Sequence, residues 1–236
     1  MYRSTLTLLT AMAMTASFGL QANPHAGQTT RQHNPMTVIV TGDDQTVASE
    51  RTQNLRPFSQ LQLNSSVPVT LVTHPSITQS RMIISGSDAF VQSVVAEHRR
   101  DVLRLSQQGT NLNHGRAQIR IEAPGLASIV VNGSGNLRAS EFHGEHLQLV
   151  INGSGNIIID GQVETLDASI SGNGQLNASG LSARVVDVAV SGSGGAYLRA
   201  AEVLRAAVSG SGSVRYSGNP EQVNSAISGS GSVQSH

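Results

Sequence analysis

Residues 131–137 read Val131-Asn132-Gly133-Ser134-Gly135-Asn136-Leu137, and close variants of this heptapeptide return five more times along the chain. Successive first glycines lie 18 to 20 residues apart. The six glycine pairs are Gly133/Gly135, Gly153/Gly155, Gly172/Gly174, Gly192/Gly194, Gly210/Gly212 and Gly229/Gly231. Self-similarity at such a period is the signature of a repeat architecture. We therefore interpret residues 127–236 as one repeat domain in which each glycine pair marks the same corner.

Between the glycine pairs, apolar residues alternate with other residues, which is the period of a β-strand. Several positions, counted from the glycine pair, are apolar in nearly every copy and must share one face of the strand. Two residues before the first glycine lie Val131, Ile151, Ile170, Val190, Val208 and Ile227; six before it lie Ala127, Leu147, Leu166, Val186, Leu204 and Val223; two after the second glycine lie Leu137, Ile157, Leu176, Ala196, Val214 and Val233. We expect these residues to form the core.

A single repeat of this length cannot bury its apolar face, so successive copies must stack. Parallel stacking places equivalent residues about 4.8 Å apart. The pattern predicts an all-β fold, a parallel β-solenoid of about six coils of 18–20 residues, right-handed by the general preference of parallel connections. Each coil is expected to have two clear strands and a weaker third side. Glycine is expected at both positions of every corner because a positive φ costs it little.

The N-terminal residues have the features of an export signal. Arg3 precedes an apolar run from Leu6 to Leu20, and Leu20-Gln21-Ala22 provides a small-residue cleavage site, so residues 1–22 are interpreted as a secretory signal. Residues 23–50 are polar and are interpreted as a flexible leader. We expect an exported protein, periplasmic or at the cell surface or secreted, with no transmembrane segment in the mature chain.

The composition excludes several classes of protein. The chain has 15 basic (Lys and Arg) and 15 acidic residues, so its formal charge is zero. A nucleic-acid binder needs a basic surplus, and nucleic acid is therefore not an expected partner. The absence of Cys excludes disulfides, thiolate metal sites and cysteine nucleophiles. The Gly-Ser-Gly copies lack the third glycine of a dinucleotide-binding loop, and no cofactor is predicted.

The repeated Val-x-Gly-Ser-Gly-x-Leu pattern resembles the GIN-domain family of bacterial exported proteins, which are described as head domains of autotransporter adhesins. The stretch before the first repeat is similar to the same family through Leu55-Arg56-Pro57-Phe58-Ser59-Gln60-Leu61, Val67-Pro68-Val69-Thr70-Leu71, and Ile83-Ile84-Ser85-Gly86-Ser87-Asp88 leading into a short helix over 89–95. The resemblance covers Arg51 to the C-terminus, implies a β-helical fold and export, and brings no catalytic residues. We expect residues 51–126 to form a β-rich segment that caps the solenoid.

Two groups of residues resemble reactive sites. Asp167 and Asp187 occupy the same outward position in adjacent coils, and paired carboxylates on such a face would suit the cleavage of a polysaccharide. Arg205 follows in the same row, so a surface charge ladder is the interpretation that we favour. The stretch 143–146, His-Gly-Glu-His, lies at a corner and lacks the helical i, i+4 spacing of a zinc site. No metal site and no catalytic residue are predicted.

One outward row differs from an ordinary solvated strand face. This small-residue row, three before the first glycine, consists of Val130, Val150, Ser169, Ala189, Ala207 and Ala226. A solvated face normally carries charged or larger polar side chains, so we expect this row to be an interface. The two candidate occupants are residues 36–126 folded back on it and a second copy of the chain.

A second outward row, three after the second glycine, is a candidate ligand site. This Tyr–Arg row reads Arg138, Ile158, Asn177, Tyr197 and Arg215. Tyr197 and Arg215, on adjacent coils, are placed to contact a glycan or an acidic ligand, with Arg138 further along the row. A purely structural cation–π pair is the alternative. The uncapped last coil also favours end-to-end self-association.

These features predict an exported, non-enzymatic binding, adhesin-like or envelope-scaffold protein whose ligand the sequence does not identify. The expected partners are an envelope protein or a glycan, and further copies of the same chain. The alternative is a polysaccharide-active enzyme that uses carboxylates on the solenoid face.

Overall fold

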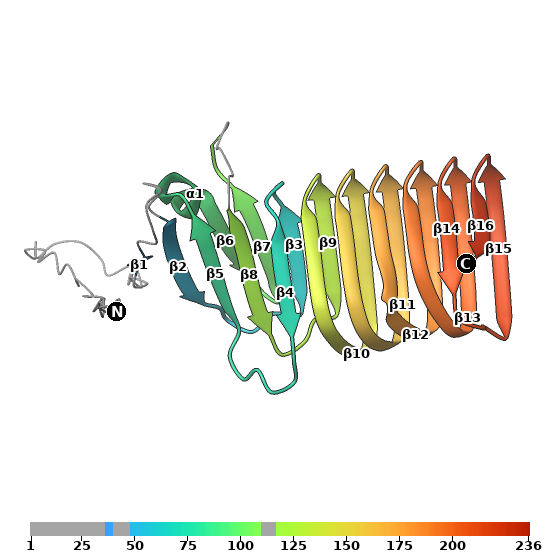
Figure 1. Ribbon diagram of the computed structural model, residues 1–236, viewed down its shortest axis with the longest axis horizontal. Helices are drawn as coiled ribbons and strands as arrows, with labels where there is room; N and C mark the ends of the chain where they lie inside the picture. Colours follow the sequence, from blue (N-terminus) through green and yellow to red (C-terminus); the bar gives the residue numbers. More distant parts are fainter. Residues whose placement is uncertain (1–35, 40–47, 110–116) are drawn as a thin grey trace, which may run out of the picture. The chain divides into compact units, whose positions relative to one another are not determined.

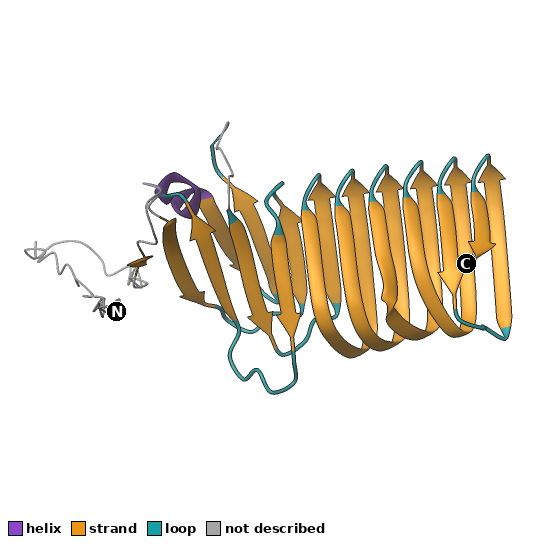
Figure 2. Cartoon of the chain, in the orientation of Figure 1, coloured by secondary structure: helices purple, strands orange, loops and turns teal. Residues whose placement is uncertain are grey.

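We describe the protein from a computed structural model, which covers residues 36–39, 48–109 and 117–236. These residues belong to one unit, Asn34–His236. The expected signal, residues 1–22, lies outside them. All of the described secondary structure is β-strand except for one short helix, as the alternating pattern predicts (Figure 2).

The glycine pairs separate the strands of a parallel β-solenoid. These strands are β9 (Ser128–Gly133), β10 (Asn136–Gly153), β11 (Asn156–Gly172), β12 (Gln175–Gly192), β13 (Gly195–Gly210), β14 (Ser213–Ser217), β15 (Gln222–Gly229) and β16 (Ser232–Ser235). β10 to β13 each run unbroken from one pair to the next and curve between two faces of the stack (Figure 1). The expected third side is thus a bend within these strands. The pairs enclose about five turns, fewer than the six expected, because β9 and β16 are part-turns outside the first and last pair.

The solenoid has two faces, each a ladder of parallel strands. The first face contains β4 (Val69–Thr73), the first halves of β10 to β13, β14 and β16; the second contains β3 (Gln60–Asn64), β9, the second halves of β10 to β13, and β15. Equivalent residues of the repeat are paired, as in the series Leu137, Ile157 and Leu176. Each row of the repeat therefore becomes a line of stacked side chains.

The inward rows form the core as predicted, with three exceptions. Residues such as Leu147, Ile151 and Leu166 are at most 1% exposed. Ala127 is exposed because it precedes β9 and lies outside the ladder, where its N–H donates to the Ser59 carbonyl. Val223 is 40% and Ile227 48% exposed, since they belong to the last described turn, on which no further described strand stacks.

All six predicted corners are present, but a positive φ accounts for only one of the two glycines in each corner. The first glycine has a positive φ, as in Gly192 at +117°, which side chains disfavour. This explanation is the one that the sequence predicts, and it holds for every first glycine. These are Gly133, Gly153, Gly172, Gly192, Gly210 and Gly229.

The same explanation is wrong for the second glycine of each corner, which has no positive φ. This correction applies to Gly135, Gly155, Gly174, Gly194, Gly212 and Gly231. The physical reason for glycine at these six positions is steric. A Cβ on any of them would lie between 2.5 and 2.8 Å from a backbone carbonyl oxygen of the neighbouring turn or, for the first pair, of Ser65.

The hydrogen bonds between turns explain this close approach. The Gly174 carbonyl, which lies against Gly194, accepts the N–H of Gly195 at 3.1 Å, and the Ser193 N–H likewise donates to Gly172 at 3.0 Å. The hydrogen-bonded stack thus continues through the corner and leaves no room for a side chain. The close contact between turns therefore requires glycine in the second position, and the sequence of one turn does not reveal that contact.

The segment before the repeats continues both ladders. β3 pairs in parallel with β9 and with β7 (Val102–Gln107), and β4 pairs in parallel with β10 and with β8 (Gln118–Ala123). The antiparallel strands β5 (Arg81–Gly86), β2 (Ala48–Asn54), β1 (Met36–Ile39) and β6 (Val94–Arg99) follow outward (Figure 1). Helix α1 covers Asp88–Ser93, with Ser87 as its N-cap, and ends before the predicted residue 95 because Val94 begins β6.

Part of the expected leader is ordered in strands. Met36–Ile39 pairs antiparallel with Ala48–Arg51, so β1 and the start of β2 fall inside residues 23–50. The β-branched residues of 37–39 favour this pairing. None of the described helices is both long and apolar enough to cross a membrane.

Candidate functional site

The second face carries a groove of about 510 Å³ across β10, β11, β12, β13 and β15. The small-residue row contributes Ser169, Ala189, Ala207 and Ala226 to its lining, and a parallel charged row contributes Gln148, Asp167, Asp187, Arg205 and Asn224. Strand alternation places both rows on the outer surface, because the residues between them point into the core. The groove is therefore a surface feature of stacked small residues beside charged ones.

The two aspartates that resemble a catalytic pair are engaged by basic side chains. Asp167 and Asp187 are direct partners across β11 and β12. The Asp187 carboxylate accepts hydrogen bonds from Arg205 Nη1 at 3.1 and 3.2 Å. Asp167 Oδ2 lies 3.5 Å from Nε2 of His146. The favoured charge ladder between Asp187 and Arg205 is thus present.

The described part of the chain leaves most of the small-residue row uncovered. Ala189, Ala207 and Ala226 are exposed, and Val130 and Val150 are half-buried. Residues 36–126 were one candidate cover, and their described part does not provide it. It stacks on the end of the solenoid instead, because its own strands supply backbone partners for β9 and β10.

The Tyr–Arg row forms one line across the first face. Its five residues are paired strand by strand from Arg138 to Arg215. The Arg215 guanidinium carbon lies 5.7 Å from the ring centroid of Tyr197, within cation–π range. The Tyr197 side chain remains 40% exposed. The row continues through Thr70 of β4, a residue that the repeat pattern does not reach.

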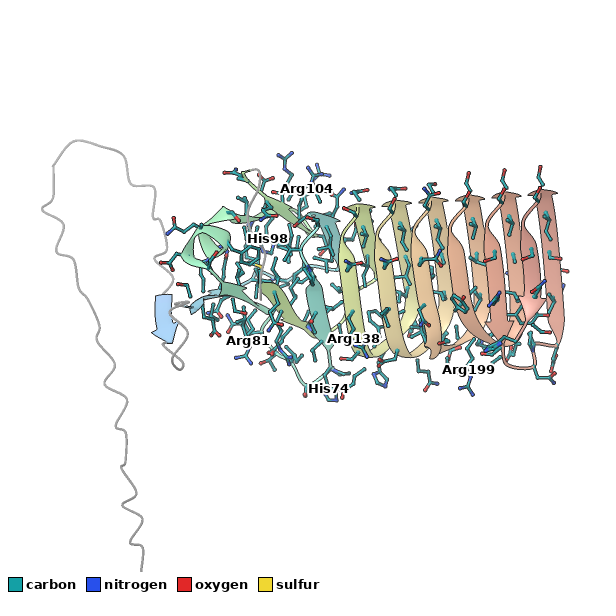
Figure 3. All side chains as sticks on the ribbon, turned by 45° about the horizontal axis from the view of Figure 1, so that its top comes forward. His74, Arg81, His98, Arg104, Arg138 and Arg199 are labelled. Atoms are coloured by element: carbon teal, nitrogen blue, oxygen red, sulfur yellow. The ribbon has the colours of Figure 1, made fainter. Side chains whose placement is uncertain are left out.

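Arg199 lies beside this row on the same face, although reasoning from the sequence did not identify it. It follows Tyr197 by two residues on β13 and is exposed, so it lies on the same face. Within the described ranges, no carboxylate lies within ion-pair distance of Arg138, Arg199 or Arg215. Figure 3 shows Arg138 and Arg199 projecting from the stack. The sequence feature that indicates this position is the two-residue spacing from Tyr197, because residues two apart in a strand lie on the same face.

Other charged groups are neutralised locally. At the bend, Arg184 donates to Glu164 at 2.8 Å and to Glu202 at 3.0 Å. The hydrogen bond that Arg184 donates to Glu164 is the main cause that raises the pKa of Arg184. These carboxylates come from the turns below and above Arg184. The contrast with the unpaired arginines of the first face distinguishes a structural ladder from a candidate binding surface.

Two titratable groups of the N-terminal segment have shifted pKa values. The hydrogen bond from Arg81 at 2.6 Å, followed by that from Arg120 at 2.9 Å, lowers the pKa of Glu122. Burial, and then the positive charge of Arg56, lowers the pKa of His98. Both ring nitrogens of His98 are buried without a hydrogen-bond partner. These groups bear on stability, since they lie outside both candidate surfaces.

The corner at 143–146 has local partners. His143 Nδ1 lies 2.7 Å from the Glu141 carbonyl, and His146 faces Asp167. Among residues 36–39, 48–109 and 117–236, no three His, Asp or Glu side chains gather closely enough to hold a metal ion.

Comparisons with known proteins agree with this architecture. The model of the family described as "Putative auto-transporter adhesin, head GIN domain" matches residues 57–220. A crystal structure of a putative adhesin from Bacteroides fragilis is 22% identical, with a TM-score of 0.67, over 80% of this chain and 97% of that chain. Another putative adhesin, from Parabacteroides distasonis, is 19% identical, with a TM-score of 0.54, over 81% and 98%. At these identities the likeness shows the fold. No curated protein matches the chain.

Proposed function

Because the chain belongs to the family described as putative auto-transporter adhesin, head GIN domain, we propose that it is an exported, non-enzymatic binding protein that recognises an anionic ligand on its first face. The ligand class is a glycan or other envelope polymer that carries carboxylate or sulfate groups. Export to the periplasm or the cell surface is part of the proposal, and the signal-like residues 1–22 support it.

The observation that carries the proposal is the unneutralised basic surface around Tyr197. Arg199 and Arg215 flank the exposed Tyr197 ring without a carboxylate partner among the described residues. A guanidinium group binds carboxylate or sulfate through paired N–H donors, and an exposed aromatic ring offers a face for a sugar. Asp160, on β11, accepts the backbone N–H of Glu141 at 3.0 Å.

The alternative, a polysaccharide-active enzyme, would use Asp167 and Asp187 in the groove of the second face. Their direct pairing across β11 and β12 favours this alternative. The ion pair of Asp187 with Arg205 supports the binding function instead, since a nucleophilic or basic carboxylate must be available to substrate.

Calorimetric titration with polygalacturonate and heparin tests the proposal, with neutral dextran as the reference polymer. We expect both anionic polymers to bind and dextran not to bind. Arg199→Gln and Arg215→Gln should each weaken binding at least about tenfold, because a hydrogen bond to a charged group contributes about 1.5–3 kcal/mol. Arg104→Gln is the matched control: it removes the same charge from β7, where Arg104 bonds Gln62 at 3.0 Å, and should leave binding unchanged.

Two results would contradict the proposal. Equal binding of dextran and the acidic polymers would show that the arginines do not select anionic ligands. If none of the polymers bound, the proposed class of anionic ligands would be wrong. The same mixtures are assayed for new reducing ends, and release of reducing ends that Asp187→Asn abolishes would establish the enzymatic alternative.

A further inference from the structure

We propose that the second face is the interface between two copies of this chain, related by a two-fold axis that runs parallel to the strands and passes between β12 and β13. The inference concerns the face opposite the candidate ligand site and goes beyond the proposed function. It rests on the groove, on its exposed small residues and on the order of charges along its charged row.

The first step is the chemistry of the groove. Ala189, Ala207 and Ala226 are exposed in stacked strands, and the described residues place nothing over them. Small side chains allow another sheet to approach closely, and facing sheets pack with their strands nearly aligned. A flat face of this kind suits a partner that is itself a flat β-sheet.

The second step is symmetry. A two-fold axis parallel to the strands keeps each row opposite the same row of the partner but reverses the order of the turns, so that β12 lies opposite the partner's β13. Such a contact is isologous, with the same patch used by both copies. Ala189 then faces the partner's Ala207, and half-buried Val185 faces the partner's Val203, so apolar groups meet apolar groups.

The third step is charge complementarity, which selects the register. With the axis between β12 and β13, Asp187 lies opposite the partner's Arg205, and Arg205 opposite the partner's Asp187. Together with the Asp187–Arg205 pair inside each copy, these contacts form an alternating network of four charges.

Neighbouring registers lack this network. An axis between β11 and β12 would place Asp167 opposite the partner's Asp187, and an axis through β12 would place Asp187 opposite itself. Like charges juxtaposed at an interface are strongly unfavourable. In the proposed register, Asp167 lies opposite the partner's Asn224, which is neutral. Of these registers, only the one with its axis between β12 and β13 brings opposite charges together, so the charged row favours that alignment.

The experiment measures the mass of the described protein in solution by sedimentation, for the parent chain, Asp187→Arg, Arg205→Asp and the double variant. We expect the parent to be a dimer. Each single reversal should raise the dimer Kd at least about a hundredfold, because it replaces two attractive contacts between copies by two repulsive ones. The double variant, which exchanges the charges, should dimerise like the parent.

Mixing the two single variants provides the decisive arm. The Asp187→Arg chain presents two positive groups and the Arg205→Asp chain two negative ones, so the mixture should form a heterodimer although each variant alone is monomeric. Thermal unfolding followed by circular dichroism verifies that each variant is folded, and Ala207→Gln, which adds bulk without charge, serves as a second disrupting variant. A monomeric parent at its highest soluble concentration would overturn the proposal, and so would a dimer that all these variants leave unchanged.

Discussion

Four glycine-to-alanine substitutions separate the two physical reasons for glycine at the corners. Gly133 has φ +89°, and no atom beyond its chain neighbours would lie within 4 Å of an added Cβ, so Gly133→Ala tests backbone conformation alone. Gly194→Ala tests steric contact alone. Gly192→Ala combines both, since its φ is +117° and its Cβ would lie 2.5 Å from the Gly172 carbonyl oxygen. Gly125 has neither feature and is the matched control.

The expected losses in the free energy of unfolding follow from these differences. Gly133→Ala should cost about 1–2 kcal/mol, the penalty of a left-handed backbone for an L-residue. Gly194→Ala should cost about 2–4 kcal/mol, because its Cβ displaces the Gly174 carbonyl from its hydrogen bond and lies 2.8 Å from the buried Ile170 side chain. Gly192→Ala should cost about 3–5 kcal/mol. Gly125→Ala should be neutral or stabilise by up to about 1 kcal/mol by restricting the unfolded chain.

Urea unfolding at 25 °C, monitored by far-UV circular dichroism, measures these differences, provided that the dependence of the free energy of unfolding on urea concentration is the same for all variants. The order of stability should be Gly125→Ala, Gly133→Ala, Gly194→Ala and then Gly192→Ala. The reasoning would be refuted if Gly133→Ala were as stable as Gly125→Ala, because positive φ would then carry no cost. It would equally be refuted if Gly192→Ala were no worse than Gly133→Ala, because the contact between turns would then carry none.

Two further predictions concern the pH dependence of stability. The pKa of Glu122 is lowered chiefly by Arg81 and Arg120. The stability that Glu122 contributes is therefore fully present above its ordinary pKa of 4.5 and is lost as the pH falls through its folded-state pKa. Glu122→Gln should flatten the dependence of the urea midpoint on pH in that range, and an unchanged slope would contradict the assignment. The pKa of His98 is lowered by burial and by Arg56. As the pH falls, the unfolded state therefore binds the proton first, and stability should decrease from pH 6.5 down to the folded-state pKa. His98→Asn should abolish this decrease, and a decrease that persists in the variant would show that another group causes it.

The repeat made the solenoid core predictable from the sequence. The inward position of residues such as Ile151 and Leu166 depends on strand alternation and on distance from a glycine corner, and both are local properties of the chain. The Asp187–Arg205 pair and the Tyr197–Arg215 contact were predictable for the same reason: their partners lie 18 residues apart, which is one turn.

Contacts outside the period could not be predicted in this way. Asn132 donates to Asn64 at 2.7 Å, across 68 residues, and then accepts from Asn152 at 3.0 Å. The second bond follows the repeat, whereas the first joins β9 to a strand that belongs to no repeat. The described strands within residues 36–126 lie at the end of the solenoid for the same reason: β3 and β4 pair with β9 and β10, and these contacts follow no repeat.

The amino-acid pattern was sufficient to specify the parallel β-solenoid, its corners and its inward rows, because each turn repeats the same local pattern and contacts its neighbours at a nearly constant separation along the chain. Which outward surfaces stay uncovered and which charges stay unpaired depended on the folded molecule. Arg184 is neutralised by two neighbouring turns while Arg199 is not, and a groove lies beside Asp187. Exposure and charge pairing depend on everything that packs around a side chain, including segments without a period, and the sequence of one row does not contain that information.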